Sequence, residues 1–264
     1  MVATLLIIDA MNLIRRIYAV QEKQHGETDA AIVATQTTAC NALKKLLQIH
    51  QPSHVISVFD SHAPSWRHHL YPNYKLGRKP IPPLLQQTLG NIQDLFLAMG
   101  VESLVTESDE ADDLIATLAD KMAKKKQKCI IVSTDKGFYQ LLNAQIIIYD
   151  YFQHRYTDAL AVVNKMGLSA AQLCDYWAIT GISSSAIKGV EGIGSKGALA
   201  LLQQFNSLDN ILKQPADEQD KRLTKVLQSR EDALLARELV TLQKEIALGF
   251  NLQDLRYPVA GVKK

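Results

Sequence analysis

Four short apolar runs in the first 150 residues each lead into an aspartate, and longer stretches with helical spacing lie between them. The runs lie at 4–8, 55–59, 129–132 and 146–149, and the helical stretches at 10–17, 29–49, 82–99 and from 111 onward. Such alternation predicts a doubly wound parallel sheet with helices on both faces. The carboxyl ends of parallel strands meet at one edge, so we expect Asp9, Asp60 and Asp135 to share a crevice there. Asp150 ends the fourth run without comparable support.

An acidic stretch at 108–113 precedes apolar residues at helical spacing, which predicts a helix capped by Ser108 or Asp109. Helical geometry places Glu110 and Asp113 on one flank and Asp112 on the other. Acids in a first turn can simply complement the helix dipole. However, two carboxylates about 5 Å apart repel by roughly 3 kcal/mol at an effective dielectric near 20. A cluster that also includes the strand-end acids therefore calls for a hard divalent cation, Mg²⁺ or Mn²⁺.

The segment 64–80 between the second strand and the acidic helix is rich in proline, aromatic and basic residues. Such a composition can neutralise phosphates and stack unpaired bases. The alternative is a solvated basic loop that its aromatic residues anchor to the body of the protein. The residues concerned are Trp66, Arg67, Tyr71, Tyr74, Lys75, Arg78 and Lys79.

The chain has 264 residues, 47% of them hydrophobic, and a formal net charge of +2, which neither requires nor excludes nucleic acid. No apolar run is long enough to span a membrane, and nothing directs secretion. Three scattered cysteines favour free thiols in a reducing cytoplasm over disulfides or zinc. Beyond residue 150 the strands give way to predicted helices near 169–181, 195–205, 207–213 and 231–247.

A glycine-rich segment at 189–197 joins two of these helices and contains G-x-G-x-x-G at 192–197. No strand precedes it, which excludes a dinucleotide site, and Ser195 follows Gly194 where a P-loop requires lysine. A glycine hairpin between helices lets a phosphate backbone approach amide groups at a helix N-terminus. It therefore predicts a grip on duplex DNA, and its carbonyls are candidate ligands for K⁺. The alternative is a glycine turn between packed helices.

Taken together, several motifs resemble the bacterial 5′ nuclease family, which includes the 5′-3′ exonuclease domain of DNA polymerase I. The resemblance spans about residues 3–250 and implies a PIN-like, Rossmann-like parallel sheet at 1–160 with an arch at about 61–99. It also implies a helical helix-three-turn-helix region at 161–250 that binds duplex DNA, followed by a tail at 251–264. The motifs are the strand-end acids, Trp66-Arg67-His68, Tyr74-Lys75-x-Gly77-Arg78, Glu110-Ala111-Asp112-Asp113, Ser133-Thr134-Asp135-Lys136 and the glycine hairpin.

The same resemblance implies roles for individual residues. Tyr74, Lys75 and Arg78 match arch positions that contact the scissile phosphate or the threading strand. The implied metal ligands are Asp9, Asp60, Glu110, Asp112, Asp113 and Asp135. The implied K⁺ carbonyls belong to Ile179, Thr180, Lys188, Val190 and Ile193, and the implied DNA-binding residues are Gly192, Ile193, Gly194, Ser195, Lys196 and Gly197.

This chain also departs from the family pattern. Gly137, Ile182 and Ser185 stand where relatives carry aspartates, so the second metal site has lost three ligands. We nevertheless expect a monomeric, Mg²⁺-dependent enzyme that cuts 5′ flaps of branched DNA in replication or repair. A DNA-structure binder that has lost its chemistry and a PIN-type ribonuclease are the alternatives.

Overall fold

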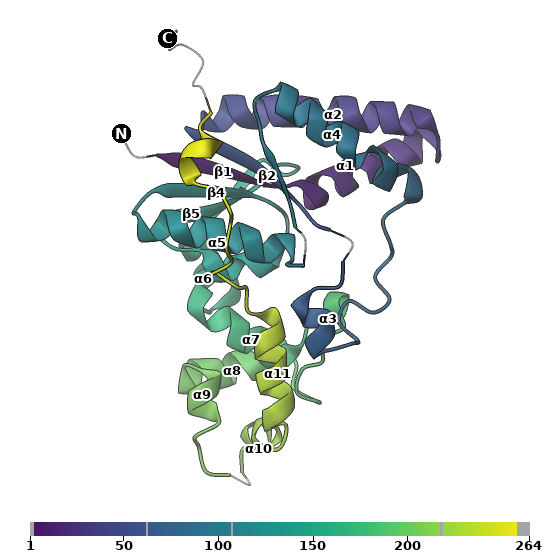
Figure 1. Cartoon of the computed structure of the whole chain (residues 1–264). Coiled ribbons are helices and arrows are strands. Elements are labelled where there is room, and N and C mark those ends of the chain that lie inside the picture. Colours follow the sequence, from purple (N-terminus) through teal and green to yellow (C-terminus); the bar gives the residue numbers. More distant parts are fainter. Residues whose placement is uncertain (1–2, 62, 107, 217–218, 258–264) are drawn as a thin grey trace.

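The fold is taken from a computed structural model, which describes residues 3–61, 63–106, 108–216 and 219–257. Within these residues one six-stranded sheet has the order β3-β2-β1-β4-β5-β6 (Figure 1). The first five strands of that order are parallel and β6 is antiparallel to β5. The strands are β1 (Thr4–Asp9), β2 (His54–Phe59), β3 (Ser103–Val105), β4 (Lys128–Val132), β5 (Ile146–Asp150) and β6 (Arg155–Thr157).

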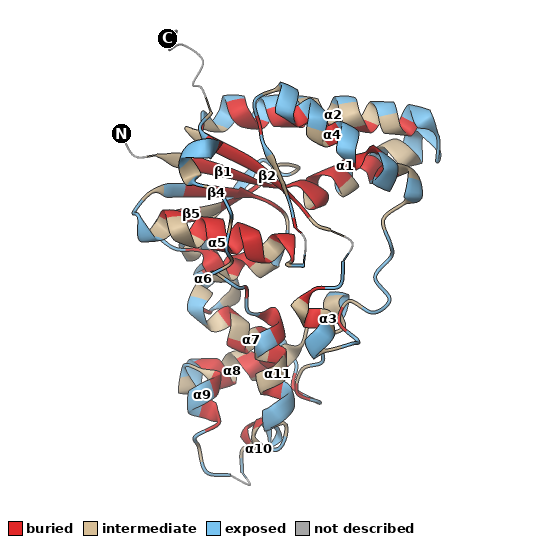
Figure 2. Ribbon diagram, viewed as in Figure 1, coloured by how far each residue is buried: buried red, intermediate tan, exposed pale blue. Residues whose placement is uncertain are grey.

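Helices cover both faces of the sheet, which explains why its central strands are apolar throughout. On β1, Leu6 and Ile8 face the cluster formed with α1 (Ala10–His25), α2 (Asp29–His50) and α4 (Pro83–Ala98). Leu5 and Ile7 face the other cluster, which includes α5 (Ala111–Lys124). All four side chains are completely buried, as the red ribbon of β1 in Figure 2 shows.

The helical part continues from the α5 side of the sheet, and one hydrophobic cluster runs through both. Helix α6 leads into this part, and α11 packs along α7 (Figure 1). The short helix α3 (Trp66–Leu70) belongs to the arch segment. The remaining helices are α6 (Ala159–Met166), α7 (Leu173–Thr180), α8 (Ser195–Phe205), α9 (Leu208–Ile211), α10 (Lys221–Gln228) and α11 (Arg230–Val240), with 3-10 turns at Lys136–Leu141, Ala170–Gln172, Ser183–Ser185 and Leu252–Leu255.

The predicted fold class is confirmed, with corrections at its periphery. A strand, β6, follows residue 150, where strands were expected to end. The predicted helix at 231–247 stops at Val240, because the amide groups that follow bond to other elements instead. Leu242 N donates to Gln140 Oε1 at 3.0 Å and Gln243 N donates to Asp113 Oδ1 at 2.9 Å. Among the described residues, no helix has both the length and the apolar character needed to cross a membrane.

Candidate active site

The first two strand-end aspartates each organise the start of a helix. Asp9 caps α1, where its Oδ1 accepts a bond from Asn12 N at 3.1 Å, and its Oδ2 accepts one from Ser133 Oγ at 2.7 Å. Asp60 Oδ1 accepts a bond from Ala111 N at 2.7 Å, so a residue that follows β2 satisfies the first amide of α5. The N-cap position of α5 is Glu110 rather than Ser108 or Asp109. Because each carboxylate bonds to a second segment, the acids lie at fixed positions at the strand ends.

The strand-end acids and Asp112 form one electrostatic group, which we call the acidic pocket: Asp9, Asp60, Asp112 and Asp135. Burial raises the pKa of Asp9 to about 7, and the charges of Asp60 and Asp135 contribute to the rise although bonds from Ser133 and Asn12 oppose it. Burial likewise raises the pKa of Asp112 well above its ordinary value, and so do the charges of Asp135, Asp9 and Asp60. The chain therefore brings these four acids together, as the strand pattern predicts.

Glu110 and Asp113 lie in a second group, on the flank of α5 that helical spacing assigns to both. Asp113 is completely buried and receives Arg67 Nη1 at 2.6 Å and Arg67 Nη2 at 2.8 Å. It also accepts bonds from Trp66 Nε1 at 3.0 Å and from Gln243 N at 2.9 Å. Both oxygens of Asp113 are thus engaged by donors, which differs from the expectation that it joins the metal ligands.

Glu110 is held by four neighbours from the arch segment. Arg67 Nη1 and Tyr74 Oη each lie 3.1 Å from Glu110 Oε2, while Ser65 Oγ lies 2.9 Å and Lys75 Nζ 3.3 Å from Oε1. Burial by itself raises the pKa of Glu110, but Lys75 and Arg67 outweigh it and the pKa lies below its ordinary value. Glu110 is therefore a stable anion beside the acidic pocket.

The arch residues differ in how deeply they are buried. Trp66 and Arg67 bond to Asp113, and Tyr74, which is 7% exposed, bonds to Glu110. These contacts overturn the expectation that Arg67 contacts DNA and that Tyr74 stacks on bases. Lys75 is half-buried with its ammonium toward Glu110, and Arg78 is exposed. Arg78 therefore lies at the surface, whereas Lys75 is already paired with a carboxylate.

The donor set of the acidic pocket consists of carboxylate oxygens, which suits a hard divalent cation. In the ranges that the structure describes, no three histidine, cysteine, aspartate or glutamate side chains are already arranged to hold a metal ion. The carboxylates of Asp9 and Asp60 are turned toward protein donors instead. The pocket therefore fits an ion that keeps part of its water shell and is reached through those waters.

The residues that stand where relatives carry ligands of the second metal, Gly137 and Ser185 among them, make other contacts here. Asp135 is exposed, and its Oδ1 accepts a bond from Gly137 N at 2.7 Å. A Cβ at Gly137 would lie 3.1 Å from that same oxygen, so a side chain at residue 137 would start beside Asp135. Ser185 contributes its carbonyl, which accepts a bond from Lys75 N at 2.8 Å. The segment before the glycine hairpin thus contacts the base of the arch without supplying a carboxylate.

The glycine hairpin is built on a close crossing of two main-chain segments. A Cβ at Gly181 would lie 2.5 Å from Gly189 N and 2.6 Å from the Ile187 carbonyl oxygen, and Gly181 has φ +71°. Val190 N donates to the Ile179 carbonyl at 2.8 Å across this crossing. Beyond it, Ile193 is buried while Gly192, Gly194, Ser195 and Lys196 are exposed at the start of α8. Ile193 thus anchors a hairpin whose backbone faces solvent.

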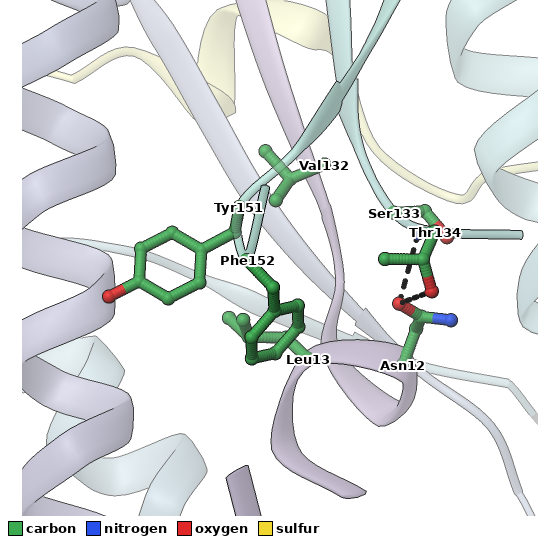
Figure 3. Close-up of a pocket in the computed structure, with 7 residues that line it drawn as sticks. All are labelled: Asn12, Leu13, Val132, Ser133, Thr134, Tyr151 and Phe152. Atoms are coloured by element: carbon green, nitrogen blue, oxygen red, sulfur yellow. Dashed lines mark hydrogen bonds between the residues drawn. The ribbon is translucent and has the colours of Figure 1, made fainter. Parts of the chain in front are cut away.

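Several contacts at the acidic edge of the sheet involve residues whose roles were not predicted from the sequence. Ser133 bonds to Asp9, and Asn12 Oδ1 accepts bonds from Thr134 N at 3.1 Å and Thr134 Oγ1 at 3.0 Å. Arg15 Nη2 donates to the Lys79 carbonyl at 3.1 Å, which ties α1 to the arch segment. For Asn12 and Ser133 the available signal was a polar residue two or three positions from a strand-end acid, whereas Arg15 carried no such signal. Asn12 and Thr134, together with Tyr151 and Phe152, line a pocket that is too small to enclose a ligand (Figure 3).

Comparison with known proteins places this arrangement among nucleases. A flap endonuclease of Psychromonas ingrahamii named Xni is 68% identical over 97% of this chain and 98% of its own length. The Xni flap endonuclease of Aeromonas salmonicida is 51% identical over 97% of each chain. The fold matches the T5 D15 protein co-crystallised with metal ions, with a TM-score of 0.77 at 19% identity over 90% of this chain and 89% of that one. It also matches a bacteriophage T5 flap endonuclease variant in a pseudo-enzyme-product complex with DNA and metal ions, with a TM-score of 0.74 at 20% identity over 90% of this chain and 88% of that one.

Two family models cover nearly the whole chain. Residues 4–167 match the 5′-3′ exonuclease N-terminal resolvase-like domain, and residues 168–261 match the 5′-3′ exonuclease C-terminal SAM fold. Their junction lies at the end of α6, where the chain passes from the sheet into the helical part. With the acidic pocket, the arch cations and the glycine hairpin in this setting, the chain belongs to the 5′-3′ exonuclease family.

Proposed function

We propose that this protein is a metal-dependent flap endonuclease that hydrolyses phosphodiester bonds at the 5′ flaps of branched DNA. The observation that carries the proposal is the convergence of Asp9, Asp60, Asp112 and Asp135 beside a cationic arch. The names of its relatives agree with this reading, and the Xni flap endonuclease of Psychromonas ingrahamii matches this chain over nearly its whole length. Processing of flaps in DNA replication and repair is the setting that this activity implies.

The proposed metal is Mg²⁺, with Mn²⁺ as a substitute of the same oxygen preference. Asp112, Asp9 and Asp60 would hold it, largely through waters, with Asp135 toward a weaker second position. Glu110 and Asp113 support the pocket from the Arg67 side rather than as direct ligands. A bound divalent ion supplies a hydroxide nucleophile at neutral pH and offsets the charge that develops on the phosphate.

The chain's own residues supply positioning and charge. Lys75 lies between Glu110 and solvent and can neutralise a phosphate oxygen, while Arg78 extends the cationic surface along the arch. Tyr74 belongs to the arch segment and orients Glu110 through the hydrogen bond that its hydroxyl donates. With the scissile phosphate between these cations and the acidic pocket, the reaction is confined to one geometry.

The glycine hairpin supplies the grip on the duplex. Gly194, Ser195 and Lys196 are exposed at the start of α8, which has no side-chain cap, so we propose that their amides donate to a phosphate. The proposed K⁺ site lies beside the crossing of Gly181 and Gly189, with the carbonyls of Ile179, Thr180, Lys188, Val190 and Ile193 as its ligands. Replacing K⁺ by Na⁺ at equal ionic strength should weaken duplex binding while leaving binding of single-stranded DNA unchanged.

The decisive experiment is a Mg²⁺ titration of a labelled 5′-flap substrate with the wild type and with Asp112→Asn. Cleavage should rise with Mg²⁺ in the wild type and be lost in the variant, while both proteins bind the flap equally in EDTA. Wild-type cleavage by the Asp112→Asn variant would refute the assignment.

The depleted second site favours one competing function, a DNA-structure binder without chemistry. Gly137, Ile182 and Ser185 remove three carboxylates, and Asp135 is left exposed. The binder predicts tight flap binding with no product at any Mg²⁺ concentration, so the same titration separates the two. An RNA flap tested beside the DNA flap distinguishes a ribonuclease.

A further inference from the structure

Arg67 is a buried arginine at the meeting point of three chain segments. Its residue is 1% exposed, although it belongs to the arch segment and stands in the first turn of α3. A cation in that position does not reach a DNA phosphate at the surface. Its function must therefore lie in what it contacts inside the protein.

The guanidinium of Arg67 uses all five of its N–H groups. On α5, Nη1 donates to Asp113 Oδ2 at 2.6 Å and to Glu110 Oε2 at 3.1 Å, and Nη2 donates to Asp113 Oδ1 at 2.8 Å. At the end of α11, Nε donates to the Leu239 carbonyl at 2.7 Å and Nη2 to the Thr241 carbonyl at 3.0 Å. One planar group thus joins the arch, the catalytic side of α5 and the helical part.

The bonds to α11 are directed at carbonyls that the helix itself leaves free. Helix α11 ends at Val240, so the last carbonyls of the helix need external donors. Asp113 completes the junction, because its Oδ1 also accepts Gln243 N from the extended chain beyond α11. The placement of the helical part and the orientation of the two carboxylates on α5 therefore depend on the same side chain.

We propose that Arg67 is a positioning residue that sets the geometry of the acidic pocket by fixing Glu110 and Asp113 at the start of α5 against the end of α11. This inference rests on the proposed nuclease function. Asp112 lies between Glu110 and Asp113 in the chain, so a rotation or shift of the first turn of α5 moves it relative to Asp9 and Asp60. Lys75 moves too, because its ammonium bonds to Glu110. Arg67 therefore also sets the position of the helical part, which would hold the duplex, relative to the residues that would cut the flap.

Arg67→Lys tests this idea, since lysine keeps the charge but loses the planar fork. Arg230→Lys is the matched control, because Arg230 also donates to a main-chain carbonyl, that of Leu212 at 3.2 Å, away from the acidic pocket. We expect Arg67→Lys to lower kcat on a 5′ flap by about 100-fold or more, the scale on which small misplacement acts. KM and DNA affinity in EDTA should stay within about threefold of wild type, and Arg230→Lys should match wild type.

Hydrogen exchange provides a readout that does not depend on activity. The Gln243 amide should exchange faster in Arg67→Lys, whereas the Phe152 amide, which bonds to Asp150 away from α5, should be protected as in wild type. A phosphate-binding arginine predicts something different: weaker DNA binding and a salt dependence reduced by about 0.9 in slope, with normal kcat. That result, or wild-type kcat with unchanged Gln243 exchange, would overturn the proposal.

A second variant covers the case in which Arg67→Lys does not fold. Arg67→Gly refolded with millimolar guanidinium or methylguanidinium should recover kcat in proportion to the added ion, because the ion can occupy the vacated position. Urea at the same concentration should not restore it. Recovery that is equal with urea, or absent with both, contradicts the positioning role. If the wild type itself cleaves no flap, the nuclease assignment fails while the exchange at Gln243 still decides the role of Arg67.

Discussion

The stability of the metal-free protein should depend on the charge of Asp9, and Asp9→Asn tests that dependence. Asp9 is 6% exposed, and its pKa rises from an ordinary 3.8 to about 7 through burial and the charges of Asp60 and Asp135. A rise of that size corresponds to about 4 kcal/mol of unfavourable free energy when the folded protein must ionise this group. Asparagine keeps an acceptor for Asn12 N and removes the charge.

The direction of the stability change follows from the linkage between proton binding and folding. A carboxyl whose pKa is higher in the folded state favours folding at low pH, and that contribution is lost as pH rises from about 4 through about 7. In EDTA at pH 8, Asp9→Asn should therefore be more stable than the wild type. If relaxation of the pocket halves the cost to about 2 kcal/mol, the melting temperature should rise by about 4–8 °C. At pH 4 the two proteins should melt within about 2 °C of each other, because little of that contribution is lost before the pH exceeds the ordinary pKa of 3.8.

The assay is thermal unfolding followed by circular dichroism from pH 4 to 8, with and without Mg²⁺. Asp150→Asn is the control: Asp150 also ends a strand and accepts bonds from Phe152 N and Gln153 N, but it lies outside the acidic pocket. It should show no gain in stability at pH 8. Mg²⁺ should stabilise the wild type more than Asp9→Asn, since binding to the folded state adds stability. An Asp9→Asn protein that melts below the wild type at pH 8 in EDTA would show that the acidic pocket carries no electrostatic strain.

Two further predictions concern backbone crossings and the second metal position. Gly181→Ala should destabilise the helical part by about 1–3 kcal/mol and weaken duplex binding, because its Cβ would lie 2.5 Å from Gly189 N. The control Gly194→Ala places its Cβ in open space and should have the stability of the wild type. Equal stability of the two variants in urea unfolding would contradict the close crossing. Gly137→Asp should lower the Mg²⁺ concentration needed for half-maximal flap cleavage several-fold, since it places a second carboxylate next to Asp135. An unchanged Mg²⁺ titration would mean that the second position plays no part in cleavage.

Local patterns in the sequence predicted the four central strands, the acidic edge of the sheet and the family, but not the edge strands β3 and β6. Apolar runs that end in aspartate report strand position because a buried parallel strand must be apolar on both faces, and its end is where polar side chains first reach solvent. The residues at 195–205 and 29–50 followed the helical period, and the helices formed there. Glu110 and Asp113 share a flank of α5 because three-residue spacing in a helix requires it. These features depend on local periodicity and on nothing distant.

The packing of distant segments decided which charged residues are exposed and which support the fold from inside. Composition cannot separate Arg67 from Arg78, since both are cations in one basic, aromatic segment; yet Arg67 is buried against Asp113 while Arg78 is exposed. The end of α11 likewise follows from bonds to Asp113 and Gln140, which lie 100 or more residues earlier. Whether a charge lies inside or outside depends on partners that meet only when the chain folds, because a buried charge is tolerated only where those partners satisfy it.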